Sequence, residues 1–340
     1  MQSIYGYTEE MLKDYMINMG EKPFRSSQII EWLYRKKIKS FDEMTNIKKD
    51  FINRLNNDFL LDSLECVAHQ KSADGTQKFL FRLTDGNLIE TVLMCHDYGY
   101  SVCVTTQVGC NMGCVFCASG MKKKLRNLDA SEIVLQVLTV SMLADVRVSH
   151  VVVMGIGEPF DNYDNVIRFL KIINHPLGLE IGARHITVST CGLVPKIYDY
   201  ADFDLQVNLA ISLHAPNNEI RNQIMPINKA YQIEELIKAI KYYIEKTNRR
   251  VTIEYILLKD LNDSIKCANE LCDLLHGLNV YVNLIPYNEV IEKPYKRSKK
   301  EDMVAFFDLL KKRRINVQLR REQGGDIDAA CGQLRSKHLK

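Results

Sequence analysis

The sequence lacks any long apolar run and any stretch with the character of an export signal. None of the apolar runs within its 340 residues approaches the roughly 18 residues that a membrane-spanning helix needs. The first ten residues contain no basic stretch followed by an apolar segment. These absences argue against a membrane protein and against an exported one. We expect a cytoplasmic protein without a membrane partner.

Two glycine-rich nucleotide-binding patterns are also missing. The chain has neither the Rossmann fingerprint nor the Walker loop. In both patterns, glycines let backbone N–H groups approach phosphates closely. These two routes to dinucleotide or nucleoside triphosphate binding are therefore excluded.

Cysteine, by contrast, is plentiful, with ten residues. In a chain without an export signal, this indicates metal or redox use in a reducing compartment. Cys110, Cys114 and Cys117 have the spacing C-x3-C-x2-C, with Gly109 and Gly113 beside them. A closed zinc site needs a fourth protein ligand, which does not follow at the usual spacing. Three thiolates on an iron-sulfur cluster would leave one iron open, and we favour this over three buried structural thiols.

Positive charge is concentrated near the C-terminal end. Residues 293–340 hold fourteen Lys and Arg against six Asp and Glu, a local charge of +8, so residues 1–292 carry −5 of the total of +3. A second basic run, residues 122–126, follows the cysteine triplet. Such runs are often solvated faces, but two of them favour a polyanionic substrate.

The periodicity changes twice along the chain. Residues 1–62 have the pattern of short helices, which predicts a small helical accessory domain. Residues 63–98 predict a short β extension, with clear strands over 78–83 and 88–94. From residue 99 to 321, apolar strands alternate with helices, which predicts an α/β fold with a parallel sheet, such as a β/α barrel. The predicted strands are 101–108, 150–155, 184–190, 205–213, 250–258, 278–286 and 315–321, and the predicted helices are 131–144, 162–174, 232–246, 264–276 and 300–313.

Polar residues gather where these strands end, which is the active face of a β/α barrel. Glu158, Ser189, Ser212, His214 and Asn288 are the candidates, and together they argue for a ligand site more strongly than for turn caps.

Three further residues stand out from their surroundings. Glu90 interrupts an apolar strand, where it is either exposed, as alternation permits, or an inward-facing acid with a function. Composition alone favours the exposed position. Cys103 and Cys331 stand apart from the triplet and are either structural thiols or reactive ones.

These motifs resemble known families. The C-x3-C-x2-C spacing resembles the signature of the radical S-adenosylmethionine (SAM) enzymes. Segments 103–110, 155–159, 207–217 and 325–334 are similar to those of the RlmN/Cfr family of RNA adenine methyltransferases within that group. The resemblance covers nearly the whole chain and implies a partial (β/α)6 radical SAM barrel over 99–321. It also implies a C-terminal segment, 322–340, that carries a methyl-accepting cysteine.

The resemblance implies a role for each candidate residue. Cys110, Cys114 and Cys117 would hold one 4Fe-4S cluster, whose electron cleaves SAM to a 5′-deoxyadenosyl radical. Cys331 would accept a methyl group from one SAM. The radical from a second SAM would take a hydrogen atom from this S-methyl group, and the resulting carbon radical would add to an adenine carbon. Cys103 would help to release the product by forming a disulfide with Cys331. Glu90 would accept a proton, which reverses the exposed interpretation. The expected SAM contacts are Gly157, Glu158, Ser189, Ser212, Leu213, His214 and Asn288.

The resemblance also implies the partners. RlmN members methylate carbon 2 of an adenosine in the peptidyl-transferase centre of 23S rRNA, and also the adenosine after the anticodon in some tRNAs. Cfr members prefer carbon 8 of the same rRNA adenosine and confer antibiotic resistance. Pro159 and the run 210–217 resemble RlmN members more than Cfr members, and this resemblance favours carbon 2. A cellular electron donor is also expected. A different class of function stays open, namely a cluster-bearing RNA-binding or redox-sensing protein, which would not need both Cys103 and Cys331.

Overall fold

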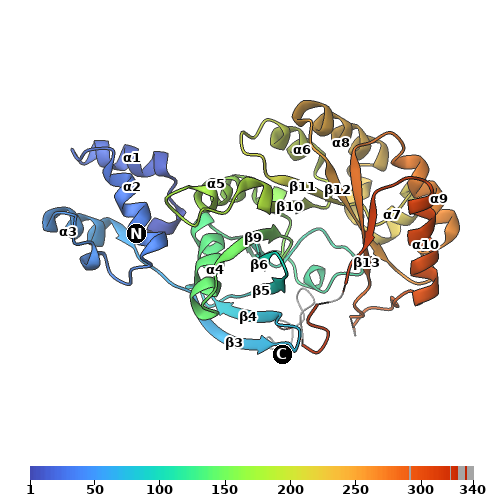
Figure 1. Cartoon of the computed structure of the whole chain (residues 1–340), viewed down its shortest axis with the longest axis horizontal. Coiled ribbons are helices and arrows are strands. Elements are labelled where there is room, and N and C mark those ends of the chain that lie inside the picture. The colour runs from blue at the N-terminus through green and yellow to red at the C-terminus, as the bar shows by residue number, and fades with distance from the viewer. Residues whose placement is uncertain (291, 322, 328–333, 335–340) are drawn as a thin grey trace.

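A large α/β lobe and a small helical lobe at the N-terminus make up the chain (Figure 1). The computed structural model describes residues 1–290, 292–321, 323–327 and 334. A ten-stranded sheet in the order β14-β13-β12-β11-β10-β9-β6-β5-β4-β3 runs through the large lobe. Within the described residues, no helix combines the length and the apolar character needed to cross a membrane.

Seven of these strands are parallel and form the barrel-like part of the sheet. Their residues are largely β-branched and apolar, which suits strands that are covered on both faces. Each strand pairs in parallel with the next in the order β6, β9, β10, β11, β12, β13 and β14. The strands are β6 (Gly99–Cys103), β9 (Val148–Val153), β10 (Ile186–Thr190), β11 (Asn208–Ser212), β12 (Val251–Leu257), β13 (Val280–Pro286) and β14 (Val317–Leu319).

Helices follow the strands and bury one apolar face. In α8 (Ile233–Thr247), Ile233, Leu236, Ile237 and Ile240 recur at helical spacing and are all buried. The five predicted helices are confirmed, with ends that differ by one or two residues. Two short helices, α6 and α7, were not predicted because each is too brief for a clear period. The helices are α4 (Ala130–Leu143), α5 (Tyr163–Asn174), α6 (Val194–Ala201), α7 (Asn218–Ile224), α8, α9 (Ile265–Leu274) and α10 (Lys300–Lys312).

The predicted strand 101–108 is wrong in one respect, because it is two strands. β6 ends at Cys103, and β7 (Gln107–Val108) belongs to a separate two-stranded sheet with β8 (Arg126–Asn127). Between them, the Gln136 side chain accepts a hydrogen bond from Thr105 N–H at 2.8 Å and donates one to Thr105 C=O at 2.9 Å. These bonds replace the ladder partners of Thr105, so the chain leaves the large sheet and turns toward the cysteines.

The β extension continues the barrel sheet rather than standing apart from it. β3 (Glu65–Lys71), β4 (Gln77–Arg82) and β5 (Leu88–His96) form an antiparallel meander, and β5 pairs with β6. Gly75 and Gly86 have φ of +86° and +83° in the two turns of this meander, as the Asp-Gly pairs predict. The extension therefore carries Glu90 to the edge of the barrel.

The N-terminal lobe consists of short helices, as predicted. α1 (Glu9–Asn18) begins at Thr8, whose hydroxyl accepts a hydrogen bond from Met11 N–H at 3.3 Å. α2 (Arg25–Ile30) and α3 (Lys49–Asp58) follow, and β1 (Gln2–Ser3) pairs with β2 (Phe59–Leu60) to close the lobe. The division of the chain into domains at residues 62, 98 and 321 stays a prediction.

Candidate active site

The cysteine triplet lies on a loop that is closed at its base by the β7–β8 ladder. Gln107 pairs with Asn127 and Val108 with Arg126, so residues 109–125 protrude from a fixed stem. Cys110 N–H donates to Lys122 C=O at 3.0 Å across the loop. Gly109 has φ +87°, and a Cβ there would lie 2.3 Å from Lys123 O, so only glycine fits this close approach.

Three contacts hold the outer part of this cluster loop against the barrel. Val115 N–H donates to Ile224 C=O at 3.0 Å, and the Tyr287 hydroxyl donates to Phe116 C=O at 3.2 Å. The Phe116 ring meets the His214 ring edge to face, with centroids 5.0 Å apart. The backbone around the three thiols is thus fixed by Tyr287, which follows β13, and by His214 and Ile224, which follow β11.

The chemistry of the three thiols fits an iron-sulfur cluster, whose iron ions carry positive charge. The pKa of Cys110 is raised to about 11, mainly by burial and to a smaller extent by the nearby Cys117 and Glu158 charges. Burial, together with Cys117 and Cys110, raises the pKa of Cys114 more strongly. Three thiolates at this place therefore need a positive partner, which iron supplies.

A single metal ion fits this group less well than a cluster does. Among the residues that the structure describes, no three His, Cys, Asp or Glu side chains converge closely enough to hold one ion. The thiols of a cubane cluster each bind a different iron, so they need not converge on one point.

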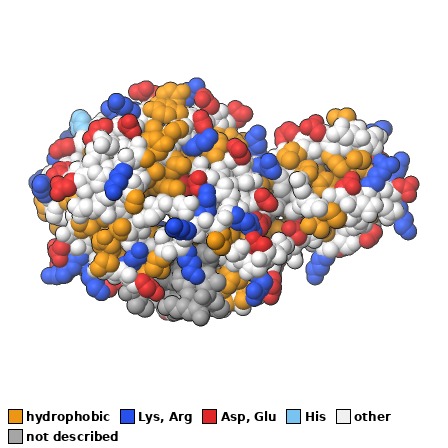
Figure 2. Space-filling view, turned by 180° about the vertical axis from the view of Figure 1, so that it is seen from behind, with side chains coloured by type: hydrophobic (Ala, Val, Ile, Leu, Met, Phe, Trp, Pro, Cys, Tyr) orange, Lys and Arg blue, Asp and Glu red, His pale blue; other side chains and the backbone are white. Residues whose placement is uncertain are grey.

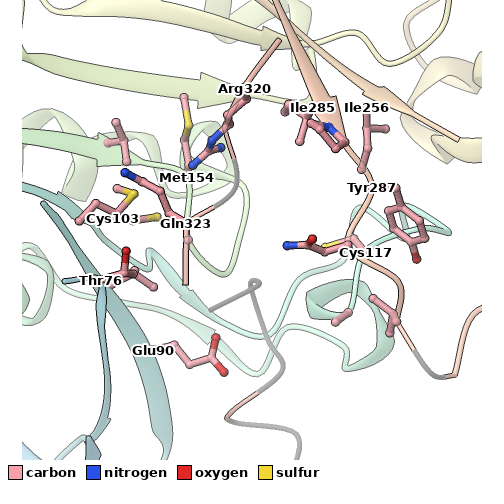
Figure 3. A pocket seen from close by; sticks show the side chains of 18 of the residues that line it. Thr76, Glu90, Cys103, Cys117, Met154, Ile256, Ile285, Tyr287, Arg320 and Gln323 are labelled. Carbon is pink, nitrogen blue, oxygen red and sulfur yellow. The ribbon is translucent and has the colours of Figure 1, made fainter. Parts of the chain in front are cut away.

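A cavity of about 300 Å³ opens beside the cluster loop. Figure 3 shows Glu90 and Cys103 on one side of it and Cys117 on the other. Asn288, which follows β13, also lines it. Four of the predicted site residues, from segments almost 200 positions apart in sequence, thus face one space. Such a concave and largely apolar site with a few polar groups is typical of substrate pockets.

Glu90 is buried, and the interpretation from composition that it is exposed is wrong. Its side chain is 4% exposed and forms an ion pair with Lys78, whose Nζ lies 3.0 Å from the carboxylate. The Lys78 side chain is itself fully buried. Lys78 lies on β4 and Glu90 on β5, near each other in the antiparallel register. A carboxylate that is kept at a cavity wall by a buried cation is positioned to exchange a proton with a substrate.

Cys103 ends β6 at the same cavity. Burial raises the pKa of its thiol to about 11, while the charge of Arg320 acts in the opposite direction. Arg320 also lines the cavity. The thiol is therefore protonated at neutral pH, and the cation beside it favours the thiolate whenever the thiol reacts. Cys331, its predicted partner, lies outside the described residues.

The carboxylate of Glu158 is held by backbone groups. One oxygen accepts a hydrogen bond from Phe160 N–H at 3.0 Å, and the other accepts one from Cys191 N–H at 2.8 Å. Gly157, with φ +110°, lets the chain pass Gln107 at a distance where a Cβ would clash. This fixes Glu158 after β9, and burial raises its pKa.

Four more predicted SAM contacts lie at the ends of β10 and β11 or directly after β11. The Ser189 and Ser212 hydroxyls lie 3.4 Å apart on these neighbouring strands. Leu213 is fully buried. Its N–H donates a hydrogen bond to Glu254 C=O, and its C=O accepts one from Arg221.

Burial lowers the pKa of His214 to about 3, and its Nδ1 accepts a hydrogen bond from Ile256 N–H at 3.1 Å. The neutral His214 ring therefore carries its proton on Nε2.

These SAM-contact candidates do not line the cavity, except Asn288. Among them, His214 contacts the outer part of the cluster loop through the Phe116 ring, and Glu158 accepts the hydrogen bond from Cys191 N–H. The roles assigned to all of these residues stay predictions.

The basic runs contribute to the site only in part. In the run 122–126, Lys124 pairs with Asp161 at 2.6 Å, and Arg126 pairs with Asp85 and Glu132. Those two cations therefore hold loops together and are less available to a polyanion. Figure 2 shows Lys and Arg interspersed with Asp and Glu on one face of the molecule. Arg320 and Arg321, by contrast, line the cavity.

Sequence reasoning missed two cations of this site. Lys78 interrupts the apolar strand β4 as Glu90 interrupts β5, and that symmetry was the available signal. Arg221 lies in a short polar helix, and nothing in the local sequence marks it as buried.

Comparison with known proteins assigns the family. Residues 104–271 match the model described as radical SAM superfamily, and residues 2–61 match the one described as ribosomal RNA large subunit methyltransferase N-terminal domain. A protein of Acholeplasma laidlawii named probable dual-specificity RNA methyltransferase RlmN is 60% identical over 336 residues, which cover 99% of each chain. The chain belongs to the RlmN family.

Other relatives agree with this family assignment. A Listeria welshimeri protein of the same name is 60% identical over 346 residues, covering 99% of this chain and 94% of its own. The crystal structure of a radical SAM methyltransferase from Sphaerobacter thermophilus superposes with a TM-score of 0.92 at 42% identity, covering 98% of this chain and 99% of its own. The radical SAM fold inferred from the cysteine spacing is confirmed. Membership of the RlmN family implies a methyltransferase that uses a 4Fe-4S cluster and SAM and acts on RNA.

Proposed function

We propose that this RlmN-family enzyme methylates carbon 2 of an adenosine in the peptidyl-transferase centre of 23S rRNA, and of the adenosine after the anticodon in some tRNAs. The observation that carries the proposal is the single cavity shared by Glu90, Cys103 and Cys117. A cluster-bearing binding or sensing protein would have no use for a buried carboxylate and a second thiol beside the cluster loop. The cavity supports a reaction in which a base meets all three.

The cofactors would be held by residues at the cavity and behind it. Cys110, Cys114 and Cys117 would bind one cluster, while Glu158, Ser189 and Ser212 would bind SAM with the help of their neighbours. When bound, the cluster and SAM supply a methyl group and the one-electron chemistry needed at an unreactive C–H bond, which no side chain provides. Two SAM molecules would be used per turnover, and a cellular one-electron donor would serve the cluster.

The side chains of this chain would then complete the reaction. Cys331 would carry the methyl carbon to the adenine ring and remain joined to it. Glu90 would remove the proton from the ring carbon, because its carboxylate faces the cavity and is held by Lys78. The Cys103 thiolate would attack the sulfur of Cys331 and form a disulfide. The bond between that sulfur and the methylene carbon would break, and the carbon would take up a proton to leave as the methyl group of the base.

The target adenine must be unpaired or unstacked to enter such a cavity. Arg320 and Arg321 are exposed at its wall, and neither forms an ion pair within the described part of the chain. Each can therefore bind a phosphate beside the flipped base.

Replacing both arginines should weaken RNA binding in a salt-dependent way. For Arg320→Ala/Arg321→Ala and a single-stranded rRNA fragment, we plot the logarithm of the association constant against the logarithm of the salt concentration. We expect this negative slope to become shallower by about 1.4, because about 0.7 counterions are released per phosphate contact. Fluorescence anisotropy over a range of salt concentrations measures this slope. The control is Lys311→Ala/Lys312→Ala, which removes the same charge from α10 outside the cavity. An equal loss in the control would contradict a specific role for the cavity pair.

The carbon that is methylated can be tested directly. The enzyme, with reconstituted cluster, SAM and a reductant, is incubated without oxygen with a 23S rRNA fragment or a tRNA, and the nucleosides are identified by mass spectrometry. We expect 2-methyladenosine. 8-Methyladenosine would instead show a Cfr-type reaction, and the absence of either product from a protein with an intact cluster would refute the proposal.

A further inference from the structure

A fully buried arginine lies behind the cluster loop without a carboxylate partner. Arg221, on α7, is 0% exposed. Its Nε donates to Leu213 C=O at 3.1 Å, its Nη1 to Asn228 Oδ1 at 2.9 Å, and its Nη2 to Cys191 C=O at 2.7 Å. All of these acceptors are neutral. A guanidinium stays charged in a protein, so a full positive charge is buried here and no carboxylate of the described chain neutralises it.

The same helix contacts the cluster loop. Ile224, at the end of α7, accepts the hydrogen bond from Val115 N–H at 3.0 Å. Pro226, two residues further, would lie 3.5 Å from a Cβ on Gly113. The charge of Arg221 acts on Cys114 and on Cys191, and the N–H of Cys191 binds Glu158. The charge of Arg221 therefore acts on a thiol that would become a thiolate when a cluster is held, and on a residue that adjoins the Glu158 carboxylate.

Buried cations are retained where a negative charge compensates for their desolvation. Three thiolates on a 4Fe-4S cluster give the site a net negative charge, and the charge becomes more negative by one when the cluster accepts an electron. A fixed positive charge in a region without water stabilises the more negative form, because screening there is weak. Cluster potentials respond to net charge and to exposure in this way.

We propose that Arg221 is a positioning residue that supplies the counter-charge of the cluster site and raises the reduction potential of the cluster. Arg221 acts from behind the loop. Its guanidinium also donates hydrogen bonds to the carbonyls of Cys191 and Leu213, which follow β10 and β11, and so holds the ends of these two strands together. The electron comes from an external one-electron reductant, and Arg221 neither gives nor takes a proton. This inference rests on the proposed cluster at Cys110, Cys114 and Cys117.

Two variants separate charge from scaffolding. Arg221→Lys keeps the charge and loses the planar fork, whereas Arg221→Met keeps much of the volume and loses the charge. Arg249→Met is the matched control, because Arg249 also binds a neutral acceptor, Asn208 Oδ1 at 2.7 Å, but at the opposite end of β11. Reconstituted proteins are titrated with dithionite at defined potentials, and the reduced cluster is quantified by electron paramagnetic resonance. Thermal unfolding of the cluster-free proteins reports the structural contribution separately.

At a fixed solution potential, Arg221→Met should hold at least about tenfold less reduced cluster relative to oxidised cluster than the wild type. For a one-electron couple this ratio corresponds to about 59 mV. Arg221→Lys should stay much closer to the wild type, and Arg249→Met should match it. A folded, cluster-bearing Arg221→Met protein with the wild-type potential would overturn the inference.

Failure to fold is also decisive. If Arg221→Met does not fold, Arg221→Gln carries the same test, because its amide can still donate to a backbone carbonyl. If neither variant folds, the guanidinium is a structural requirement and the electrostatic role is rejected. A wild-type protein that binds no cluster would instead refute the proposed function, which distinguishes the two failures.

Discussion

Cys114→Ala should yield a folded protein that no longer assembles the cluster and no longer methylates RNA. The side chain is one of three thiols on the loop closed by β7 and β8, and no other described cysteine lies within this loop. Without the third ligand, the site loses the metal chemistry that makes an adenine carbon reactive. We expect the yield of methylated adenosine to fall by at least about a thousandfold, since enzymes commonly exceed the uncatalysed rate by far more. Nucleoside mass spectrometry and iron analysis measure both effects.

The matched control is Cys272→Ala. Cys272 is a buried cysteine, 2% exposed, that lies on α9 and packs in the main core. Its replacement costs packing and should leave iron content and methylation close to those of the wild type. If Cys114→Ala retained a full cluster and substantial activity, the assignment of the triplet as the ligand set would fail.

Glu90→Gln should lower methylation by about a hundredfold to ten-thousandfold, the range for the loss of a general base. The amide cannot accept a proton at neutral pH, although it has nearly the same shape. The substitution also removes the charge that pairs with the buried Lys78, so we expect a loss of up to about 3–5 kcal/mol in the free energy of unfolding. Single-turnover assays and chemical denaturation measure the two losses.

A double variant separates catalysis from stability. Lys78→Met/Glu90→Leu replaces the buried pair with apolar groups of similar size, which often restores or exceeds the original stability. We expect this protein to unfold at nearly the wild-type denaturant concentration and to remain inactive. Wild-type methylation by the double variant would show that Glu90 has a structural role alone.

Local pattern predicted most of the barrel. The apolar strands and amphipathic helices from β9 to α10 follow from periods that packing reinforces, as in α8. The break after Cys103 was missed because it depends on the Gln136 side chain, which lies more than 30 residues away. Tertiary hydrogen bonds of this kind leave no signal in a short window of sequence.

The candidate site was accessible to sequence reasoning to a different degree at each residue. The spacing of Cys110, Cys114 and Cys117 is by itself enough to predict a metal cluster. Glu90 needed the resemblance, because composition assigned it to solvent, whereas the structure buries it against Lys78. Arg221 was beyond reach, because its burial is set by carbonyls on two strand ends and by Asn228. Charges whose partners come from several segments are visible only once the fold is known.

The proposed reaction requires that the cluster, Glu90 and Cys103 act on the same adenine in one cavity, with Cys331 as the carrier of the carbon. The most direct test uses Cys103→Ala with reconstituted cluster, SAM, a reductant and a radiolabelled rRNA fragment. Without the thiol that resolves the link, RNA should remain covalently joined to the protein, and peptide mass spectrometry should locate the junction at Cys331. The control Cys103→Ala/Cys331→Ala should form no such species. Release of methylated RNA by Cys103→Ala at the wild-type rate, with no covalent complex, would refute the proposed role of Cys103.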